Sequence, residues 1–408
     1  MKITAIVSEY NPFHNGHKYL ADKARENGAT HTVAIMGGNF LQRGECAVMD
    51  KYARAKVAVL GGIDLVLELP VIYAVSSAEG FASGAVETLD NCGVIDELCF
   101  GAECGDIEQI RKAVEMTCSE KLLDICKEYK NQGYSHPRAM QAAAQRISAN
   151  KNSDSGEDIK NAVELLSSPN NTLGVEYIRA VDRLKSNISP FAVERKGVEH
   201  NSSVKIDGFA SASAIREMIF KNENEFSNYI PITTREIIKE SISKGECPSG
   251  LIYGERAVMS ILRRMTVDDL TQIPDVTEGL ENRIYKAIRE CNSIEEIISQ
   301  IKCKRYTYAR LSRILTCAYL GVTKELSAEK PQYIRVLAFN DRGAEVLRQM
   351  KKSATLPIVM SPARDKNKLS DIGKALLEKD ILASDLYGLM TPKIKSCSSD
   401  YFTGAIKI

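Results

Sequence analysis

The sequence lacks the cysteine spacing of a zinc site and of a disulfide framework. Its eleven cysteines include no CxxC pair, and several of them lie in apolar segments, such as Cys99, Cys126 and Cys317. Scattered cysteines in apolar surroundings are typical of reduced, buried thiols. We therefore expect a cytoplasmic location, no zinc and no other metal site built from protein side chains.

Long apolar segments are also missing. No stretch approaches the roughly 18 residues of a membrane-spanning helix, so we expect no membrane partner. Residues 1–13 contain no apolar core followed by a small-residue cleavage site, and we expect no signal peptide. The composition, 44% hydrophobic and 26% charged, is that of an ordinary globular protein.

An excess of one charge sign is absent as well, since 54 Lys and Arg stand against 53 Asp and Glu. The two halves nevertheless differ. Residues 231–408 hold 29 basic and 22 acidic side chains, whereas residues 1–230 hold 25 and 31. This asymmetry favours docking of a polyanion on the C-terminal half. Chance asymmetry between two solvated surfaces is the alternative, and charge alone does not separate the two.

What the sequence does contain is a regular alternation of strand and helix patterns in its first hundred residues. Near-continuous apolar strands separated by helices predict a Rossmann-like, doubly wound parallel α/β sheet. Strands are expected at 3–8, 32–36, 64–69 and 97–100, and helices at 17–26, 49–60 and 77–89.

Helical patterns dominate the rest of the chain. Residues 106–160 are polar and helical around a loop at 150–156, and an apolar run follows at 189–193. A length of 408 residues exceeds what one hydrophobic core supports, so we expect two domains, 1–230 and a mainly helical 231–408. The C-terminal elements are expected as one strand-like run at 333–339, an apolar run at 356–360 and helices at 253–265, 278–291, 293–302, 306–320 and 343–350.

The most informative segment is His14-Asn15-Gly16-His17, where the first strand turns into a helix. Such turns, at the carboxyl ends of parallel strands, form the ligand crevice of open α/β sheets. Two imidazoles that bracket a glycine at a helix start, with its free N–H groups, suit a phosphate. The segment therefore predicts phosphoryl or nucleotidyl transfer, in which His14 and His17 stabilise developing negative charge. Two histidines placed together by chance are the alternative.

A second phosphate candidate is the segment 211–216. Ser211 and Ser213 are placed to cap a helix, and Arg216 follows in its first turn, a combination that suits a triphosphate. A simple helix cap with a surface arginine is the alternative. The turn at 168–171 and the glycine pair at 37–38 fit either an ordinary turn or a part of the nucleotide site.

Together these segments resemble the tRNA(Met) cytidine acetate ligases, a branch of the HxGH nucleotidyltransferase superfamily. The resemblance runs through the whole N-terminal domain in order, and the helical remainder has the matching length. The stretches that carry it are VSEYNPFHNGHKYL (7–20), MGGNFLQRGECAVMDKYARA (36–55), DLVLELPVIYAVSSAEGFA (64–82), FGAECGD (100–106), SSPNNTLGVEYIRA (167–180) and SASAIR (211–216).

The resemblance implies that ATP and acetate form acetyl-adenylate with release of pyrophosphate, with Mg²⁺ shared among the phosphates. The acetyl group would then pass to N4 of the wobble cytidine of elongator tRNA(Met); DNA would not be a partner. His14 and His17 would be the catalytic residues, and either Arg195 or the adjacent Lys196 would contact ATP. The expected ATP-binding residues are Val7, Ser8, Glu9, Tyr10, Asn11, Pro12, Phe13, His14, Asn15, Gly16, His17, Lys18, Tyr19, Leu20, Gly101, Asn170, Arg195, Ser213 and Arg216.

One segment of the C-terminal half, residues 302–313, interleaves cations with tyrosines at a helix start. Cations neutralise phosphates while tyrosines stack on unpaired bases, which is how single-stranded loops are held. We expect tRNA contacts from Lys304, Arg305, Tyr306, Arg310 and Arg313. A solvated helix whose tyrosines pack into the bundle is the alternative.

Two other functions stay open at this point. A small-molecule adenylyltransferase of the same superfamily would use the same HxGH segment, but it needs no basic helical appendage of this size. A non-catalytic RNA-binding protein with a degenerate nucleotide fold would not need His14, Gly16 and His17 to be intact.

Overall fold

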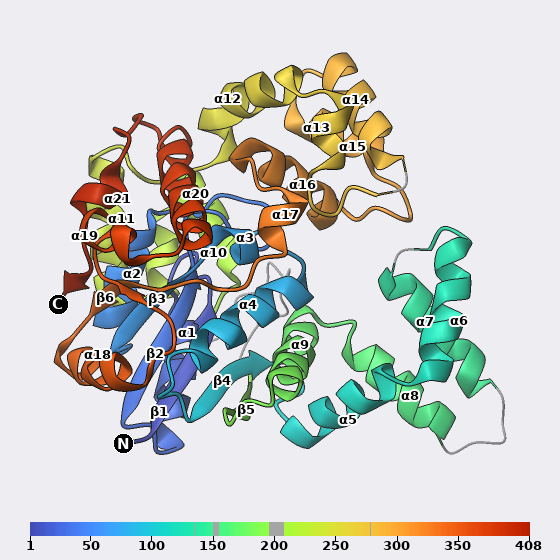
Figure 1. The fold of residues 1–408 in the computed structure, drawn as a ribbon, viewed down its shortest axis with the longest axis horizontal. Coiled ribbons are helices and arrows are strands. Elements are labelled where there is room, and N and C mark those ends of the chain that lie inside the picture. Colours follow the sequence, from blue (N-terminus) through green and yellow to red (C-terminus); the bar gives the residue numbers. More distant parts are fainter. Residues whose placement is uncertain (135, 150–154, 196–207, 278) are drawn as a thin grey trace.

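The fold is built on one mixed β-sheet with helices on both faces (Figure 1). The computed structural model describes residues 1–134, 136–149, 155–195, 208–277 and 279–408. Its strands are β1 (Ile3–Ser8), β2 (His31–Gly37), β3 (Leu65–Leu69), β4 (Glu97–Ala102), β5 (Ser189–Glu194), β6 (Ile334–Phe339), β7 (Ile358–Val359) and β8 (Ile406–Lys407).

The strand order confirms the expected doubly wound topology. Within the described residues the sheet runs β5-β4-β1-β2-β3-β6-β7, and β8 also pairs with β6. The five strands from β5 to β3 are parallel, and β1 lies at their centre. The register Ser8↔Met36 aligns the carboxyl ends of β1 and β2, and Ala102↔Glu194 aligns those of β4 and β5. The segments that follow these strands therefore meet at one edge of the sheet.

The helices of the first half include those expected around the HNGH segment. Their bounds are α1 (Asn15–Glu26), α2 (Lys51–Leu60), α3 (Val71–Ala74), α4 (Ala78–Asp90), α5 (Ile107–Thr117), α6 (Glu120–Asn131), α7 (His136–Ser148), α8 (Ser155–Leu165), α9 (Pro169–Leu184) and α10 (Ala212–Phe220). A loop was expected at 150–156. Residues 150–154 lie outside the described residues, and α8 already begins at Ser155.

The second half is mainly helical, as expected. After a short 3-10 helix (Asn224–Asn228), its helices are α11 (Ile232–Ser243), α12 (Leu251–Arg264), α13 (Val267–Thr271), α14 (Leu280–Glu290), α15 (Ile294–Ile301), α16 (Tyr308–Leu320), α17 (Lys324–Ser327), α18 (Asp341–Ser353), α19 (Pro362–Asp365), a 3-10 turn (Lys366–Lys368), α20 (Asp371–Tyr387) and α21 (Ser399–Phe402). The helix expected from residue 278 begins at Leu280, and residue 278 itself lies outside the described part of the chain.

Alternating side chains of the central strands feed two separate cores. Ile3, Ala5 and Val7 of β1 belong to the core that α4, α9 and α18 cover, whereas Ile6 belongs to the core under α1, α2, α10 and α11. A strand that is buried on both faces is apolar throughout, which is why the strand patterns were readable from sequence. Helices α6, α7 and α8 form a small core of their own and extend to one side of the sheet (Figure 1).

The sheet does not stop at residue 230. Strand β6 comes from the second half and pairs antiparallel with β3 of the first half, with Leu65 opposite Phe339. Four ion pairs form a buried group beside these strands: Lys51 contacts both Glu68 and Asp400, and Arg335 contacts the same two carboxylates. The division into 1–230 and 231–408 stays a prediction, and the C-terminal part contributes strands to the common sheet as well as helices.

None of the helices in the described residues is both long enough and apolar enough to cross a lipid bilayer.

Candidate functional site

The HNGH segment caps helix α1 with its own side chains. His14 is the N-cap residue, and its Nδ1 accepts a hydrogen bond from the backbone N–H of Gly16 at 3.1 Å. In return, Nδ1 of His17 accepts from the backbone N–H of His14 at 3.2 Å. Since Nδ1 of each ring is an acceptor, each neutral ring carries its hydrogen on Nε2. The pair therefore presents two Nε2–H donors.

The two imidazole rings stack on each other, with 3.8 Å between their centroids and 25° between their planes. Burial, together with the positive charges of Arg195 and Arg216, lowers the pKa of His14 to about 3. Burial, followed by the neighbouring His14 and Arg195, lowers the pKa of His17 well below its ordinary value. Both rings are thus neutral at physiological pH, which allows their close stacking without repulsion between like charges.

Both histidines line a cavity of about 380 Å³ at the carboxyl ends of β1, β4 and β5. This volume is in the range of sites for small ligands. Among the expected ATP-binding residues, those in the cavity wall are Val7, Ser8, Glu9, Tyr10, Asn11, His14, Gly16, His17, Tyr19, Leu20, Gly101, Asn170, Arg195, Ser213 and Arg216.

Two guanidinium groups give the cavity a positive wall. Arg195 follows β5, and its side chain crosses over Gly101: a Cβ on Gly101 would lie 3.3 Å from Cγ of Arg195. Burial lowers the pKa of Arg195. Arg216 donates to the carbonyl oxygen of Asn11 at 3.1 Å and forms an ion pair with Glu45 at 3.5 Å. Lys196, the alternative to Arg195, lies outside the described residues, as does His200.

The N-terminus of α10 reaches the same cavity as that of α1. Ser211 is the N-cap of α10, and its hydroxyl accepts from the backbone N–H of Ala214 at 3.2 Å. The hydroxyl groups of Ser211 and Ser213 are 3.0 Å apart, and both residues line the cavity. Two helix N-termini at one cavity concentrate positive electrostatic potential, and this is an arrangement that suits phosphate groups.

Asn170 stands at the start of α9, where Glu103 holds it in place. The side-chain amide of Asn170 donates to one carboxylate oxygen of Glu103 at 2.6 Å, and the backbone N–H of Asn171 donates to the other at 2.9 Å. The sequence had left open whether this turn is an ordinary one. In the structure it is both the start of a helix and a part of the cavity wall.

Four of the expected ATP-binding residues do not line the cavity. Pro12 and Phe13 are buried behind it, and the Phe13 ring packs 5.0 Å from that of Tyr10. Asn15 donates to the carbonyl of Gly208, and Lys18 is exposed and paired with Asp22. For Asn15 and Lys18 the physical reason is the helical period, because only part of α1 (Asn15–Glu26) faces the carboxyl edge of the sheet. Pro12 and Phe13 precede the helix, and their burial directs them away from the cavity. An ATP contact from any of these four residues stays a prediction.

Leu41, Gln42, Arg43 and Glu45 also line the cavity, and sequence reasoning gave them no role. Gln42, Arg43 and Glu45 belong to the NFLQRGE stretch, which was noted for its resemblance only. The backbone N–H of Gln42 donates to the carboxylate of Glu9 at 2.8 Å, and desolvation raises the pKa of Glu9. The signal that could have found them was their position after the second strand, at the same sheet edge as HNGH.

In the C-terminal segment 302–313 the structure separates exposed cations from packed residues. Lys304 is exposed, whereas Tyr306 is only 3% exposed and faces the guanidinium groups of Arg283, Arg305 and Arg310. Stacking of Tyr306 on an RNA base would require the ring to leave its packed position. This geometry favours the alternative in which the tyrosine is a part of the helical core.

The two arginines of the same segment hold a neighbouring turn. Arg310 donates to the carbonyl of Asp275 at 2.6 Å and to the hydroxyl of Thr277 at 3.2 Å. Arg313 forms an ion pair with the Asp275 carboxylate at 3.3 Å. Both side chains therefore have structural partners, and a contact with tRNA from either of them stays a prediction.

Among the residues that the structure describes, no group of three or more His, Cys, Asp or Glu side chains could hold a metal ion.

Residues 1–401 match the model of the HIGH nucleotidyl transferase family, and the chain belongs to this family. It is 39% identical to the tRNA(Met) cytidine acetate ligase of Thermoanaerobacter sp. (strain X514), with 100% of both chains covered. The ligase of Alkaliphilus metalliredigens (strain QYMF) is also 39% identical, over 95% of this chain and 94% of the relative. The crystal structure of Thermotoga maritima TmcAL bound with alpha-thio ATP covers 100% of both chains, with 33% identity and a TM-score of 0.91.

Proposed function

We propose that this chain is an ATP-dependent ligase that activates acetate as acetyl-adenylate and transfers the acetyl group to N4 of the wobble cytidine of elongator tRNA(Met). The observation that carries the proposal is the pair of neutral, stacked imidazoles in the wall of a cavity flanked by Arg195 and Arg216. The names of the full-length relatives and the ATP-analogue complex of TmcAL support the same reaction.

In the first step, a carboxylate oxygen of acetate attacks the α-phosphorus of ATP. The bond from that phosphorus to the bridging oxygen breaks, and pyrophosphate leaves. Negative charge builds on the α-phosphate oxygens and on the leaving group. The Nε2–H groups of His14 and His17 donate hydrogen bonds there, while Arg195 and Arg216 add positive charge. Since both rings are already neutral donors, this step needs no proton transfer from the protein.

In the second step, N4 of the cytidine attacks the acyl carbon of the mixed anhydride. The bond from this carbon to AMP breaks, AMP leaves, and N4 loses one proton. Free acetate resists such an attack because its carboxylate is a poor electrophile and has no good leaving group. Adenylation supplies that leaving group, and this is why the two steps are needed in one enzyme.

We propose that Mg²⁺ enters with ATP, held by phosphate oxygens and water. Mg²⁺ is commonly bound through substrate phosphates with few protein ligands, and this fits a cavity without a cluster of carboxylates or histidines among the described residues. Bound there, Mg²⁺ would neutralise negative charge on the phosphates.

We further propose that the tRNA docks on the second half of the chain. The basic balance of residues 231–408 supports this, and so does the exposed Lys304 ahead of α16. The two proposed parts of the protein would then hold ATP and tRNA, respectively.

The test is a pair of histidine variants. His14→Ala should lower acetate-dependent pyrophosphate release about 100-fold or more, the size expected when a donor to a transition-state charge is lost. Its affinity for tRNA should be retained. His31→Asn is the matched control, because His31 lies on β2 and does not line the cavity.

Mass spectrometry of elongator tRNA(Met) after incubation with wild-type protein, ATP, Mg²⁺ and acetate should show one added acetyl group at the wobble cytidine. Pyrophosphate release by the wild type that does not depend on acetate would contradict the proposal. A His14→Ala variant with a normal rate would contradict the role given to the imidazoles.

A further inference from the structure

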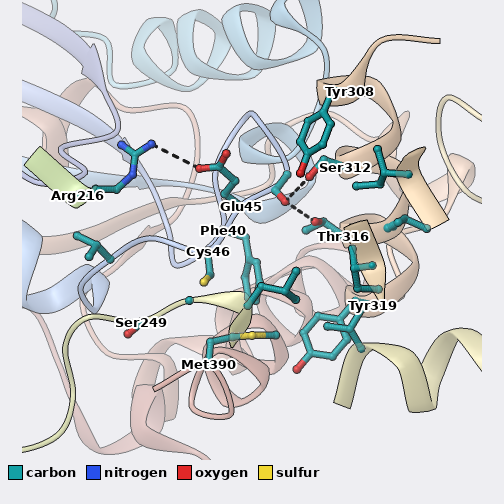
Figure 2. Close-up of a pocket in the computed structure, with 18 of the residues that line it drawn as sticks. Phe40, Glu45, Cys46, Arg216, Ser249, Tyr308, Ser312, Thr316, Tyr319 and Met390 are labelled. Atoms are coloured by element: carbon teal, nitrogen blue, oxygen red, sulfur yellow. Dashed lines mark hydrogen bonds and ion pairs between the residues drawn. The ribbon is translucent and has the colours of Figure 1, made fainter. Parts of the chain in front are cut away.

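Figure 2 shows a second cavity, of about 290 Å³. It lies beside the cavity that contains His14 and His17, which we call the nucleotide cavity. Its walls come from the loop after β2, from α12, α15 and α16, and from the turn that follows α20. The lining is largely apolar and partly aromatic, with Phe40, Val258, Leu315, Tyr319 and Met390 among its residues. The reaction steps described above assign no substrate to this space.

The two cavities share a wall. Glu45 and Arg216 line both of them, and their ion pair of 3.5 Å lies at the boundary (Figure 2). A group attached to the nucleotide in the first cavity is therefore separated from the second cavity by two side chains. Neither side chain is buried, so the boundary is made of groups that can move aside.

The loop that carries Glu45 is fixed against α16. The carbonyl of Gly44 accepts hydrogen bonds from the hydroxyls of Ser312 at 2.9 Å and Thr316 at 2.8 Å. Gly44 has a φ of +74°, and a Cβ there would lie 2.5 Å from the backbone N of Arg313, so only glycine fits this contact. The position of Glu45 thus depends on a helix from the second half of the chain.

The second cavity opens to solvent through an apolar rim. Phe220, Leu251 and Tyr308 line it and are each 40–43% exposed. A large hydrophobic side chain at the mouth of a cavity is available for contact with a flat ligand that enters from outside. The hydroxyl of Tyr308 donates to Glu295, and this bond holds its ring at the rim.

We propose that the second cavity receives the acceptor cytosine, unstacked from its neighbours in the RNA, with its N4 amine directed at Glu45. This inference rests on the proposed function. Bases that undergo chemistry are taken out of the stack and held between aromatic and apolar side chains, and the walls and rim provide such surfaces. A carboxylate accepts hydrogen bonds from the N4 amine of cytosine, which makes Glu45 the matching polar group.

In this arrangement Glu45 is a catalytic residue of the transfer step. N4 attacks the acyl carbon of acetyl-adenylate, the carbon–oxygen bond to AMP breaks, and the proton that N4 loses passes to the Glu45 carboxylate. Glu45 then releases that proton to solvent. The shared wall explains how an amine in one cavity reaches a carbonyl carbon bound in the other, since reacting atoms must approach to about 3–3.5 Å.

The first experiment narrows the cavity without touching the nucleotide side. Leu251→Trp at the rim and Val258→Phe in the wall should lower acetyl transfer to elongator tRNA(Met) at least tenfold. Acetate-dependent ATP–pyrophosphate exchange should stay within twofold of the wild type. Ile252→Trp is the matched control: Ile252 neighbours Leu251 on α12, is 77% exposed and does not line the cavity, so both reactions should be unchanged.

Unchanged transfer in both narrowed variants would overturn the proposal, and so would a parallel loss of exchange and transfer, which would place the cavity in the adenylation step. Failure of the proposed function itself is distinguishable, because the wild type would then show no acetate-dependent exchange.

The second experiment isolates the transfer step by supplying preformed acetyl-adenylate with tRNA, so that adenylation is bypassed. Glu45→Gln keeps the size and one acceptor oxygen of the side chain but not its ability to take a proton. It should slow transfer at least tenfold at saturating tRNA, as a fall in kcat more than a rise in KM. A transfer rate equal to that of the wild type would overturn the role of Glu45.

Discussion

At the residue scale, the chemistry of His14 and His17 is set by backbone hydrogen bonds. Each Nδ1 accepts an N–H group of the turn itself, so the tautomer is determined by the way the helix starts. The two rings stack as neutral groups. If either ring were protonated, its positive charge would be repelled by the nearby cations Arg195 and Arg216. The cavity wall thus combines two permanent cations, Arg195 and Arg216, with two neutral hydrogen-bond donors, the imidazoles. The arginines stay charged, and the imidazoles would lose their neutral form only in acid.

The first prediction concerns these two rings. In protein without ATP, His14 and His17 should keep a neutral Nε2–H form from pH 8 down to pH 5, because burial and nearby cations lower both pKa values. Nitrogen-15 NMR of histidine-labelled protein reports the tautomer directly, and a chain with five histidines gives few signals. His14→Ala and His17→Ala variants supply the assignments.

The lowered pKa values of His14 and His17 also determine how these residues affect the stability of the fold as the pH changes. A histidine with a lowered folded-state pKa binds fewer protons in the folded than in the unfolded chain, so its contribution to stability falls as pH drops below about 6.5. Titration of either ring with a midpoint above pH 5 would contradict the geometry described for the cavity.

At the scale of single elements, two helix N-termini and one loop line the cavity that contains His14 and His17. Helices α1 and α10 each begin with a side-chain cap from the residue that also lines the cavity, His14 in one case and Ser211 in the other. A cap and a phosphate contact compete for the same N–H groups only in part, since a helix start offers several. The arrangement lets both helices be stable before the nucleotide binds.

The second prediction concerns the segment between α15 and α16, and it distinguishes residues that bind tRNA from residues that stabilise the fold. A Lys302→Ala/Lys304→Ala double variant removes two exposed cations and should weaken tRNA binding at low salt. The slope of log affinity against log salt should fall by about 1–2, because each phosphate contact with a single-stranded region contributes about 0.7. The midpoint of thermal unfolding should not change.

Arg310→Ala is the contrasting variant. It removes hydrogen bonds to Asp275 and Thr277, so it should lower the free energy of unfolding by about 1–3 kcal/mol, measured by urea denaturation. If Arg310→Ala left stability unchanged and abolished tRNA binding, its role would be RNA contact, as the sequence suggested. A salt-independent affinity of the wild type would contradict an electrostatic contribution from this segment.

At the scale of the whole molecule, the two halves of the chain are joined through the sheet and through buried charge. Strand β6 extends the sheet beyond β3, and Lys51, Glu68, Arg335 and Asp400 are buried together beside it. Their formal charges cancel, so the group is neutral as long as all four are present. Asp400 lies near the C-terminus, whereas Lys51 belongs to α2, which makes the end of the chain a part of the core.

The third prediction tests this connection. Asp400→Asn leaves two buried cations facing one carboxylate, and the loss of one partner from a buried ionic group destabilises proteins by about 3–5 kcal/mol. Chemical denaturation of wild type and variant measures the difference. Asp341→Asn is the control, because its ion pair with Lys407 is exposed, and its unfolding midpoint should stay near that of the wild type. Equal stability of Asp400→Asn and wild type would show that the four charges contribute little.

Local sequence determined the parts of this protein that depend on near neighbours. Strands β1 and β3 are largely apolar because both of their faces are buried, and the HNGH turn contains its own caps, so these features could be predicted without a structure. The same holds for the start of α10, where Ser211 precedes a helical pattern. The positions of these turns at the carboxyl edge of a parallel sheet followed from the order of strands and helices.

Tertiary structure alone decided the contacts between distant residues. Each of these contacts brings together segments that are far apart in the sequence and that no helical or strand periodicity relates. They are the approach of Arg195 to Gly101, the ion pair of Glu45 with Arg216, the burial of Tyr306 and the pairing of β6 with β3. Side-chain burial depends on which surfaces meet after folding. A segment that alternates cations and tyrosines has the same sequence pattern whether it faces solvent or a neighbouring helix, so the pattern does not predict its burial. The sequence therefore determined that the HNGH turn and the start of α10 lie at the carboxyl edge of a parallel sheet, and the packing of the second half against the first decided what else lies around them.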